Sequence, residues 1–388
     1  MYAGPNKIIR RRSGILSRSR WPIWTLLAIA ILAVGWGVWS LRDHVAYPSA
    51  SWSSLPPQAA GFDIDRLQKF SGRLGGSGCI VYGGRMAHTW GDVSKRYDVA
   101  SAGKPFYTHF TLKAIDEGLL ESLDEPVVQW VPELADLNED LGFKDRNISF
   151  RHLLDQTSGY GLSEKPGMAF GYNDYQTGLL VWTLFRRVYA CGYGGADRML
   201  LHDLLGVHLH FEDEPTFQSP GTWPGRLSIS ARDMARFGYL YLMSGKWKGV
   251  SVIGEELVGQ ALNSALHIAT PQTQGEPAER FNRAHSIGAG LHAKGHAGAH
   301  SFFWWVNRET AQGQRLLPDA TPLTFVAMGY GGQFVMIGMP EHRLVVVWMD
   351  AFSGEMLSPF DTVGRIRVNE AIRELLAAGK IGQMESNE

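Results

Sequence analysis

The chain has 388 residues, of which 45% are hydrophobic and 19% are charged, a composition typical of a globular protein with a large core. Its 37 basic and 38 acidic side chains leave a formal net charge of -1, so no global basic excess indicates nucleic-acid binding. The two cysteines, Cys79 and Cys191, form no CxxC pair, which argues against a cysteine zinc knuckle or a thioredoxin-type redox centre. A disulfide between them could form outside the cytoplasm, although two free buried thiols are the more common outcome.

The amino terminus has the pattern of a membrane anchor. Residues 1–20 carry six basic side chains and no acidic one, and residues 21–41 then continue without a charge. At about 1.5 Å per residue, this length crosses a hydrocarbon core of about 30 Å. Tryptophans lie near both ends, and the basic flank predicts that the rest of the chain lies on the periplasmic side of the inner (cytoplasmic) membrane. The alternatives are a cleaved signal peptide, which usually has a shorter apolar region and a better cleavage site, and a buried core helix.

The remaining chain is predicted to be a linker over 42–60, rich in Ser and Pro, and one domain over 61–380. The periodicity of its apolar residues and its turn residues predict the following elements. In chain order they are a helix over 63–74, a hairpin over 79–90, a helix over 102–119, a proline-marked connection over 123–134, a short helix over 148–156, a helix over 230–244, paired strands at 334–337 and 344–348, and a helix over 365–378. This order predicts an α/β (α+β) domain whose sheet comes from both chain ends (about 61–105 and 300–380), with a helical part (about 106–299) between them. The active site would lie in the cleft between the two parts.

The tetrapeptide Ser101-Ala102-Gly103-Lys104 is a candidate nucleophile with its base. Residues i and i+3 lie on one face of a helix, and Pro105 is tolerated only in a first helical turn, so Ser101 is predicted at a helix N-terminus. The helix field and burial would both oppose the charge on Lys104, and a lysine with a lowered pKa could accept the serine proton. Alone, the tetrapeptide is weak evidence, because an ordinary helix cap with a solvated lysine has the same sequence.

The flanking sequences resemble the class C-like branch of the serine β-lactamase/penicillin-binding-protein superfamily. The similar segments are residues 90–134 around Ser101, ISFRHLLDQTSGY (148–160) and LSISARDMARFGYLYLMSGKWKG (227–249), in the order that the family has them. The resemblance implies an antiparallel sheet flanked by helices, a helical subdomain, and acyl transfer at Ser101 without a metal or other cofactor.

Two further sequence elements of the family are present in this chain, each with a difference from the usual family sequence. Tyr172-Asn173-Asp174 resembles Tyr-x-Asn, in which the tyrosine acts as the general base or shares that role; Tyr175 is the reserve candidate. Asp174 stands where Asn is usual, and its carboxylate would favour a protonated Lys104 and repel a substrate carboxylate such as that of penicillins. Residues 329–333, GYGGQ, replace Lys-Thr-Gly and look like the version found in 6-aminohexanoate-dimer hydrolase-like members. Gly331, Gly332 and Gln333 are therefore candidates for substrate binding and the oxyanion hole.

Other patterns are predicted to be structural. His292, His296 and His300 have metal-ligand spacing on a helix, but the glycines among them disfavour a helix, so we expect a loop over the cleft and no metal site. Trp304 and Trp305 could line the pocket or pack beneath it, and packing is the favoured alternative. Arg232 and Asp233 are expected to be structural, and residues 212–214 are expected to form a solvated turn.

These observations predict a membrane-anchored serine hydrolase that cleaves a small ester or amide through an acyl-enzyme at Ser101, with Lys104 and Tyr172 relaying the proton. A β-lactamase or D-alanyl-D-alanine carboxypeptidase activity is one alternative, and a catalytically silent binding or sensor module on the same fold is another. The predicted partners are the small-molecule substrate and, through residues 21–41, the membrane; the sequence does not set the oligomeric state or the physiological substrate.

Overall fold

The computed structural model describes residues 45–217, 223–288, 290–291, 295–310, 313–353 and 362–379. The anchor predicted over residues 21–41 lies outside these ranges. Within them, no helix is both long enough and apolar enough to cross a membrane.

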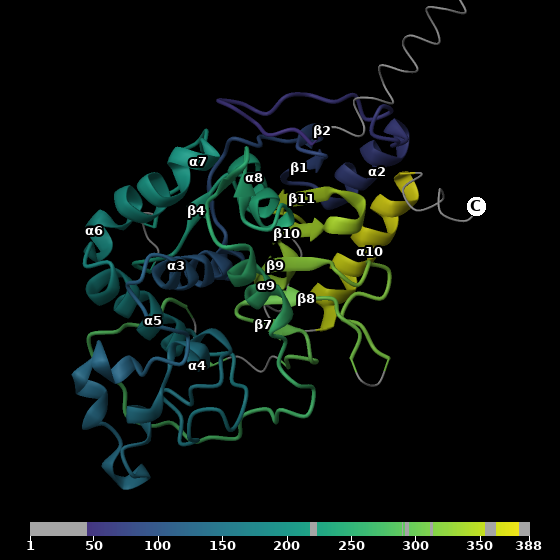
Figure 1. The fold of residues 1–388 in the computed structure, drawn as a ribbon. Helices are drawn as coiled ribbons and strands as arrows, with labels where there is room; N and C mark the ends of the chain where they lie inside the picture. Colours follow the sequence, from purple (N-terminus) through teal and green to yellow (C-terminus); the bar gives the residue numbers. More distant parts are fainter. Residues whose placement is uncertain are drawn as a thin grey trace, which may run out of the picture. The chain divides into compact units, whose positions relative to one another are not determined.

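One mixed assembly of helices around an antiparallel sheet makes up the domain (Figure 1). Its seven strands have the order β2-β1-β11-β10-β9-β8-β7, and each pairs antiparallel to its neighbours. Their bounds are β1 (Ser77–Tyr82), β2 (Arg85–Trp90), β7 (His300–Ser301), β8 (Trp304–Val306), β9 (Phe325–Gly329), β10 (Phe334–Met339) and β11 (Leu344–Met349). Ser77 pairs with Met349, so the prediction of an antiparallel sheet built from both chain ends is confirmed.

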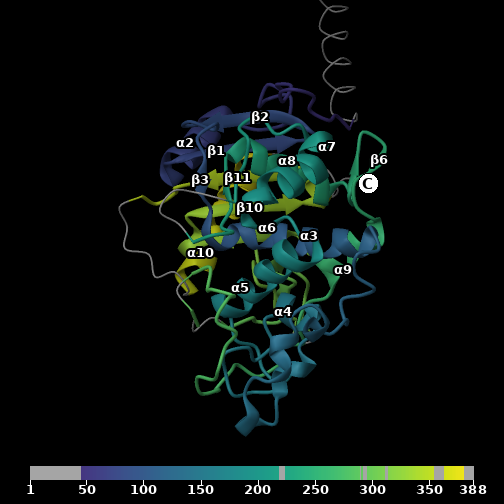
Figure 2. The ribbon, with the colours of Figure 1, turned by 90° about the vertical axis from the view of Figure 1, so that its left-hand side faces the viewer.

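Helices cover both faces of this sheet, which explains why β11 is apolar at every position. Val345, Val347 and Met349 face a core that includes α8 (Ala231–Leu242), whereas the alternate residues of β11 face the core of α2 (Ile64–Leu74) and α10 (Thr362–Ala378). Figures 1 and 2 show α2 and α10 side by side, with α8 across the sheet from them. Strands buried on both faces have continuous apolar runs instead of an alternating pattern.

The other elements form the helical part and its connections. The α-helices are α3 (Lys104–Asp116), α4 (Phe150–Leu154), α5 (Asp174–Thr183), α6 (Gly192–Ala196), α7 (Val207–Leu209) and α9 (Glu255–Asn263), and the π-helical segments are η6 (Leu184–Val188) and η7 (Asp197–Gly206). The 3₁₀ turns are η1 (Ala100–Gly103), η2 (Val127–Gln129), η3 (Pro132–Ala135), η4 (Glu139–Leu141), η5 (Lys144–Asn147), η8 (Tyr330–Gly332) and η9 (Pro340–His342). The two-residue strands are β3 (Tyr97–Asp98), β4 (Ser228–Ile229), β5 (Lys246–Trp247) and β6 (Val250–Ser251).

Two predicted helices are shorter in the structure than in the sequence analysis. The helix predicted over 102–119 is the 3₁₀ turn η1 followed by α3, with Pro105 in the first α-helical turn and Gly118 in the left-handed region (φ 72°) after the end. The helix predicted over 148–156 is α4, which begins after Ser149, whose side chain and His152 form a capping box.

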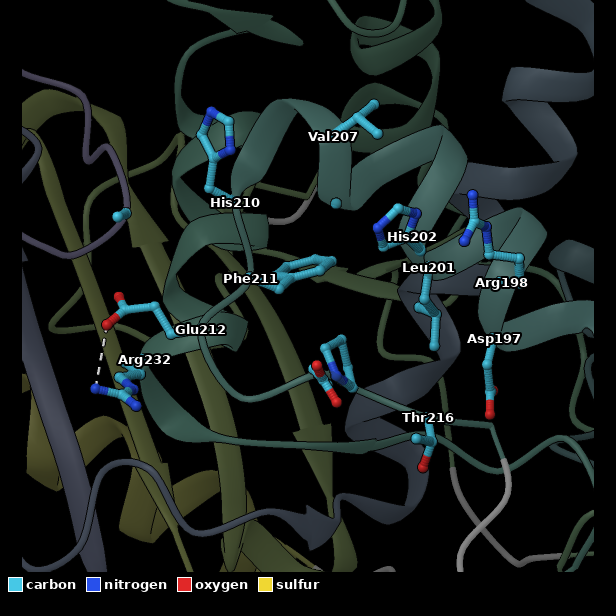
Figure 3. A pocket seen from close by; sticks show the side chains of 14 residues that line it. Asp197, Arg198, Leu201, His202, Val207, His210, Phe211, Glu212, Thr216 and Arg232 are labelled. Carbon is cyan, nitrogen blue, oxygen red and sulfur yellow. Dashed lines mark ion pairs between the residues drawn. The ribbon is translucent and has the colours of Figure 1, made fainter.

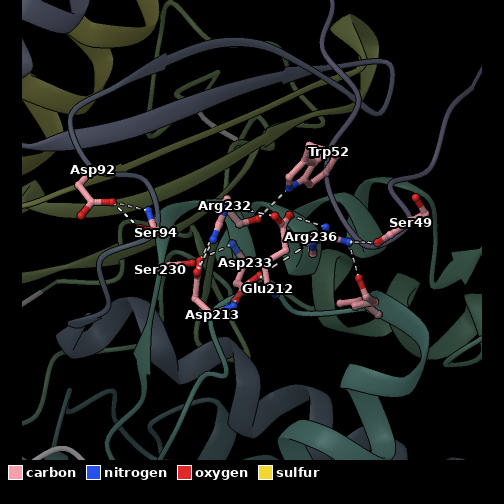
Figure 4. Close-up of polar contacts among 11 residues, drawn as sticks. Ser49, Trp52, Asp92, Ser94, Glu212, Asp213, Ser230, Arg232, Asp233 and Arg236 are labelled. Carbon is pink, nitrogen blue, oxygen red and sulfur yellow. Dashed lines mark hydrogen bonds and ion pairs between the residues drawn. The ribbon is translucent and has the colours of Figure 1, made fainter.

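A buried ion-pair network fixes α8 to the chain before α2 (Figure 4). Arg236 is fully buried and donates to Oε1 of Glu212 at 2.5 Å, to the carbonyl of Leu209 at 2.6 Å and to the carbonyl of Ser49 at 3.1 Å. The carboxylate of Asp233 accepts the backbone N–H groups of residues 212 and 213, at 2.7 and 2.8 Å. The structural role predicted for Asp233 agrees with these contacts.

The same network corrects the prediction of a solvated turn at residues 212–214. The side chains of Glu212 and Asp213 are only 10% and 11% exposed, and both pair with Arg232. Trp52 donates its indole N–H to the carbonyl of Arg232 at 3.1 Å. Three neighbouring acids in a sequence resemble a surface turn, but here arginines one helical turn apart on α8 draw two of them inward.

The cysteines and the paired tryptophans lie as favoured by the sequence. Cys79 is a buried free thiol, and Cys191 is a half-buried one. Trp304 and Trp305 are buried at 0% and 2% exposure, so they pack in the core.

Candidate active site

Ser101 lies in η1, the 3₁₀ turn that joins β3 to α3. Ala100 before it has a positive φ of 50°, which an L residue rarely adopts and which is often stored at functional sites. The carboxylate of Asp98 accepts the backbone N–H of Ala100 at 3.0 Å, and the guanidinium of Arg226 binds the same carboxylate at 2.7 Å. This arrangement holds the half-buried Ser101 at the start of the helix that carries Lys104.

Lys104 is buried among one charged and two aromatic groups. Its side chain is 3% exposed, and its Nζ donates to Oδ1 of Asp174 at 2.6 Å. The Nζ also lies 4.0 Å from the ring centroid of Tyr172 and 6.0 Å from that of Phe303. Lys104, Tyr172 and Asp174 are therefore placed together by the starts of α3 and α5, and Ser101 lies in the turn that leads into α3.

The charge state of Lys104 differs from the one that the helix field suggested. Burial lowers the pKa of Lys104, but the Asp174 carboxylate and the Tyr172 hydroxyl raise it, and the net result is a pKa above the usual value. The hypothesis of a lysine lowered toward neutrality is wrong, and the expectation that Asp174 favours the protonated form agrees with the structure. The surroundings of Lys104 therefore favour its charged form.

Tyr172 is 2% exposed, and its ring lies 6.5 Å from Phe170 and 6.2 Å from His300. The reserve candidate, Tyr175, is in a different environment, with the guanidinium of Arg280 3.6 Å from its ring centroid. The ring contact with Lys104 therefore favours Tyr172 as the catalytic tyrosine.

The glycines at the end of β9 and just after it lie in two different environments. A methyl group on Gly329 would come 2.9 Å from the backbone nitrogen of Ala102 and closer to the carbonyl of Val99, so Gly329 lies directly against η1. Gly331 and Gly332 lie against Gly364 of α10, and the carbonyl of Gly332 accepts the indole N–H of Trp348 at 2.8 Å. Gln333 is half-buried and donates its backbone N–H to the carbonyl of Tyr330.

Strand β9 is not at the edge of the sheet, yet its last residues approach the nucleophile. β8 pairs with β9 only at Phe325 and Val326, so the side of β9 beyond Val326 is open to η1. Gly329 is thus the residue of this segment that abuts the Ser101 turn.

We expect Gly329→Ala to lower kcat by about 100-fold, because a methyl group there pushes the Ser101 turn out of position. Steady-state kinetics with a chromogenic ester would measure this. Gly72→Ala is the matched control, since a methyl group at this α2 position meets nothing within 4 Å. Equal kcat values for the two variants would contradict the close approach of Gly329.

The histidines of the predicted loop lie in different surroundings where the structure describes them. His285 is exposed, His292 lies outside the described residues, and the imidazole Nε2 of His296 lies 2.8 Å from the carbonyl of Thr270. His300 is buried on β7 beside Tyr172. Among the residues that the structure describes, no three His, Cys, Asp or Glu side chains are grouped so as to hold a metal ion.

A strained turn that the sequence analysis missed lies next to Lys104. Phe302 and Phe303 connect β7 to β8 with φ values of 45° and 67°, in a two-residue turn that normally selects Asn and Gly. The hydroxyl of Thr108 on α3 donates to the carbonyl of Phe302 at 2.5 Å. The turn thereby places the Phe303 ring beside the ammonium, and no local sequence pattern signals this contact.

A separate hollow of about 960 Å³ lies along η7 and the segment 210–216 (Figure 3). Its lining mixes apolar side chains, such as Leu201 and Phe211, with charged ones, such as Arg198 and Glu214. None of its lining residues belongs to the group around Ser101.

Comparison with known proteins assigns the family. The sequence matches the β-lactamase family over residues 64–351, and the chain belongs to that family. No curated protein matches the sequence.

Solved structures share the fold at low sequence identity. A protein from Bacteroides dorei assigned as a β-lactamase has a TM-score of 0.58 and 18% identity, covering 81% of this chain and 99% of its own. A protein from Bacillus anthracis assigned as a 6-aminohexanoate-dimer hydrolase has a TM-score of 0.55 and 16% identity, covering 87% and 88%. A family VIII carboxylesterase has a TM-score of 0.54 and 14% identity, covering 84% and 99%. These likenesses establish a β-lactamase-like fold with an antiparallel sheet and flanking helices.

Proposed function

We propose that the protein is a serine hydrolase that cleaves an ester or amide through an acyl-enzyme at Ser101. The observation that carries the proposal is the meeting of Lys104, Tyr172 and Asp174 behind Ser101, with the ammonium 2.6 Å from the carboxylate and 4.0 Å from the tyrosine ring. A buried ammonium next to a phenol oxygen stabilises that oxygen when it is negative. Tyr172 is accordingly the general base, and Lys104 is the cation that supports it.

The reaction then proceeds in two steps, acylation of Ser101 and hydrolysis of the acyl-enzyme. Tyr172, acting in its deprotonated form, takes the hydroxyl proton of Ser101 on its oxygen while the serine Oγ bonds to the substrate carbonyl carbon, and Tyr172 returns that proton to the departing alcohol or amine as its bond breaks. Water then attacks the acyl carbon and gives a proton to Tyr172, which passes that proton to Oγ of Ser101 as the acyl–oxygen bond breaks and the acid leaves. Backbone N–H groups at Ser101 and at the Gly329–Tyr330 step would bind the developing oxyanion.

An uncharged carbonyl substrate fits this site better than a carboxylate-bearing one. Lys104 and Asp174 neutralise each other, so the pair offers no net positive charge to an anionic substrate. The cation of Lys-Thr-Gly is replaced by glycine and tyrosine at 329–331. Fold likeness to proteins assigned as a carboxylesterase and a 6-aminohexanoate-dimer hydrolase supports esters and short linear amides.

We expect Tyr172→Phe to lower kcat about 100- to 10,000-fold, because it removes the oxygen that moves the proton. The measurement is turnover of a panel of p-nitrophenyl esters, nitrocefin and 6-aminohexanoate dimer by residues 45–388. Tyr175→Phe is the control and should keep wild-type rates, since its ring contacts Arg280 and not Lys104. Loss of activity in Tyr175→Phe with retention in Tyr172→Phe would reverse the assignment, and turnover of nitrocefin above every ester would favour a β-lactamase.

We further propose that residues 21–41 anchor this domain to the outer face of the cytoplasmic membrane, on the basis of their uncharged length and basic flank. Protease added to spheroplasts should digest the domain. Recovery of the full-length chain in the soluble cytosol would refute the anchor.

A further inference from the structure

Gly288 lies directly against the carboxylate of Asp174. A methyl group at position 288 would come 2.7 Å from Cγ of Asp174 and 3.3 Å from its Cβ, and closer still to Oδ2. The backbone φ of Gly288 lies outside the left-handed region, so space and not backbone conformation excludes a side chain there. The other oxygen of the same carboxylate, Oδ1, is the one that binds Lys104.

The backbone around Gly288 is tied in place from two directions. Arg226, which binds Asp98 beside the nucleophile turn, also donates to the carbonyl of Ile287 at 3.2 Å. On the other side, the backbone N–H of Asp174 donates to the carbonyl of Gly290 at 3.0 Å. A side chain at 288 would therefore displace the carboxylate more readily than it would displace the backbone.

Displacing the carboxylate would change the charge balance at Lys104. The polar groups that face this ammonium are Asp174 from α5 and the Tyr172 hydroxyl from the segment before α5, and the Phe303 ring contributes no charge. The Asp174 carboxylate accepts directly from the ammonium, at 2.6 Å. Without it, a 3% exposed ammonium would face desolvation with much weaker compensation.

We infer that Gly288 is a positioning residue, whose missing side chain keeps Asp174 on Lys104 and thereby keeps Lys104 charged while Tyr172 acts as the base. The inference rests on the proposed function. It adds a residue that no sequence motif marks, because Gly288 acts on the site only through the carboxylate that it leaves in place.

The test is the pH profile of kcat/KM for Gly288→Ala, measured with a p-nitrophenyl ester on the full chain. With Asp174 displaced, burial lowers the pKa of Lys104, so the ammonium is lost at lower pH. We expect the pH at which kcat/KM falls on the alkaline side to be lower by at least about one pH unit than in the wild type. Above that pH, kcat should be about 10- to 100-fold lower than in the wild type. Gly72→Ala, in the open α2 position, should keep the wild-type profile.

A double-mutant cycle shows whether Gly288 acts through the carboxylate. In an Asp174→Ala background the carboxylate is gone and only Cβ of residue 174 remains, 3.3 Å from the added methyl group, so Gly288→Ala should change kcat less than about twofold there. This double variant also covers the case in which Gly288→Ala alone does not fold. A wild-type profile for Gly288→Ala, or a full-sized effect in the Asp174→Ala background, would overturn the inference. Melting temperatures of the same four proteins, wild type, the two single variants and the double variant, test the inference apart from the proposed function. Full turnover by Ser101→Ala would refute the proposed function, but the coupling between residues 174 and 288 in the melting temperature would still be observed.

Discussion

Ser101→Ala should lose at least about 10³-fold in kcat toward every ester or amide that the wild type cleaves. The substitution removes only the hydroxyl group, and acyl transfer cannot begin without that group. The residue is half-buried in a short 3₁₀ turn, so the melting temperature should stay near the wild-type value. Steady-state kinetics and differential scanning calorimetry on residues 45–388 would measure the two quantities.

Covalent labelling gives the same prediction without a known substrate. A fluorophosphonate probe should label the wild type and leave Ser101→Ala unlabelled, because the probe reacts with an activated serine oxygen. Ser158 is a useful second serine for comparison of labelling. It lies in the matched 148–160 segment, but its hydroxyl is buried and donates to Gln176 at 2.5 Å. Equal labelling of wild type and Ser101→Ala would leave the protein without the proposed nucleophile.

Arg236→Ala should destabilise the domain by about 3–5 kcal/mol, because it leaves buried partners of a charge without their cation. The guanidinium is fully buried and serves Glu212, Leu209 and Ser49 together, so its loss also releases the segment before α2. The free energy of unfolding in urea would measure the effect.

An exposed ion pair provides the matched control for Arg236. The side chain of Arg198 is 75% exposed and pairs with Asp203 at 2.9 Å, and exposed pairs of this kind contribute little to stability. Arg198→Ala should therefore have the wild-type unfolding midpoint. Similar midpoints for both arginine variants would show that burial of the Arg236 network does not stabilise the fold.

Sequence patterns predicted the parts of this molecule that depend on neighbours along the chain. The capped helices at 64–74 and 231–242 and the hairpin at 77–90 follow local rules for caps, apolar spacing and glycine turns. Ser101 and Lys104 were accessible for the same reason, because they lie three residues apart, and Tyr172 came from a matched motif.

The rest depends on contacts between distant segments. The sequence could name Asp174 but offered opposed influences on the pKa of Lys104, and only the folded arrangement shows that Asp174, 2.6 Å from the ammonium, and Tyr172 together outweigh burial. Gly329 could not be told from Gly331 by composition, since the difference is which backbone each one meets. Phe303 and Gly288 carry no motif at all and reach the site through turns whose positions the whole fold sets.

The pairing of Ser77 with Met349 has a consequence for how this protein is made. Strand β1 gains its second neighbour only when β11, far along the chain, has left the ribosome, and closing so long a loop is slow. Until then β1 carries an apolar, unpaired edge that can join other chains. Nascent fragments that end before β11 should therefore aggregate or bind chaperones, and synthesis of the last strand is the event that commits the hydrolase to its active form.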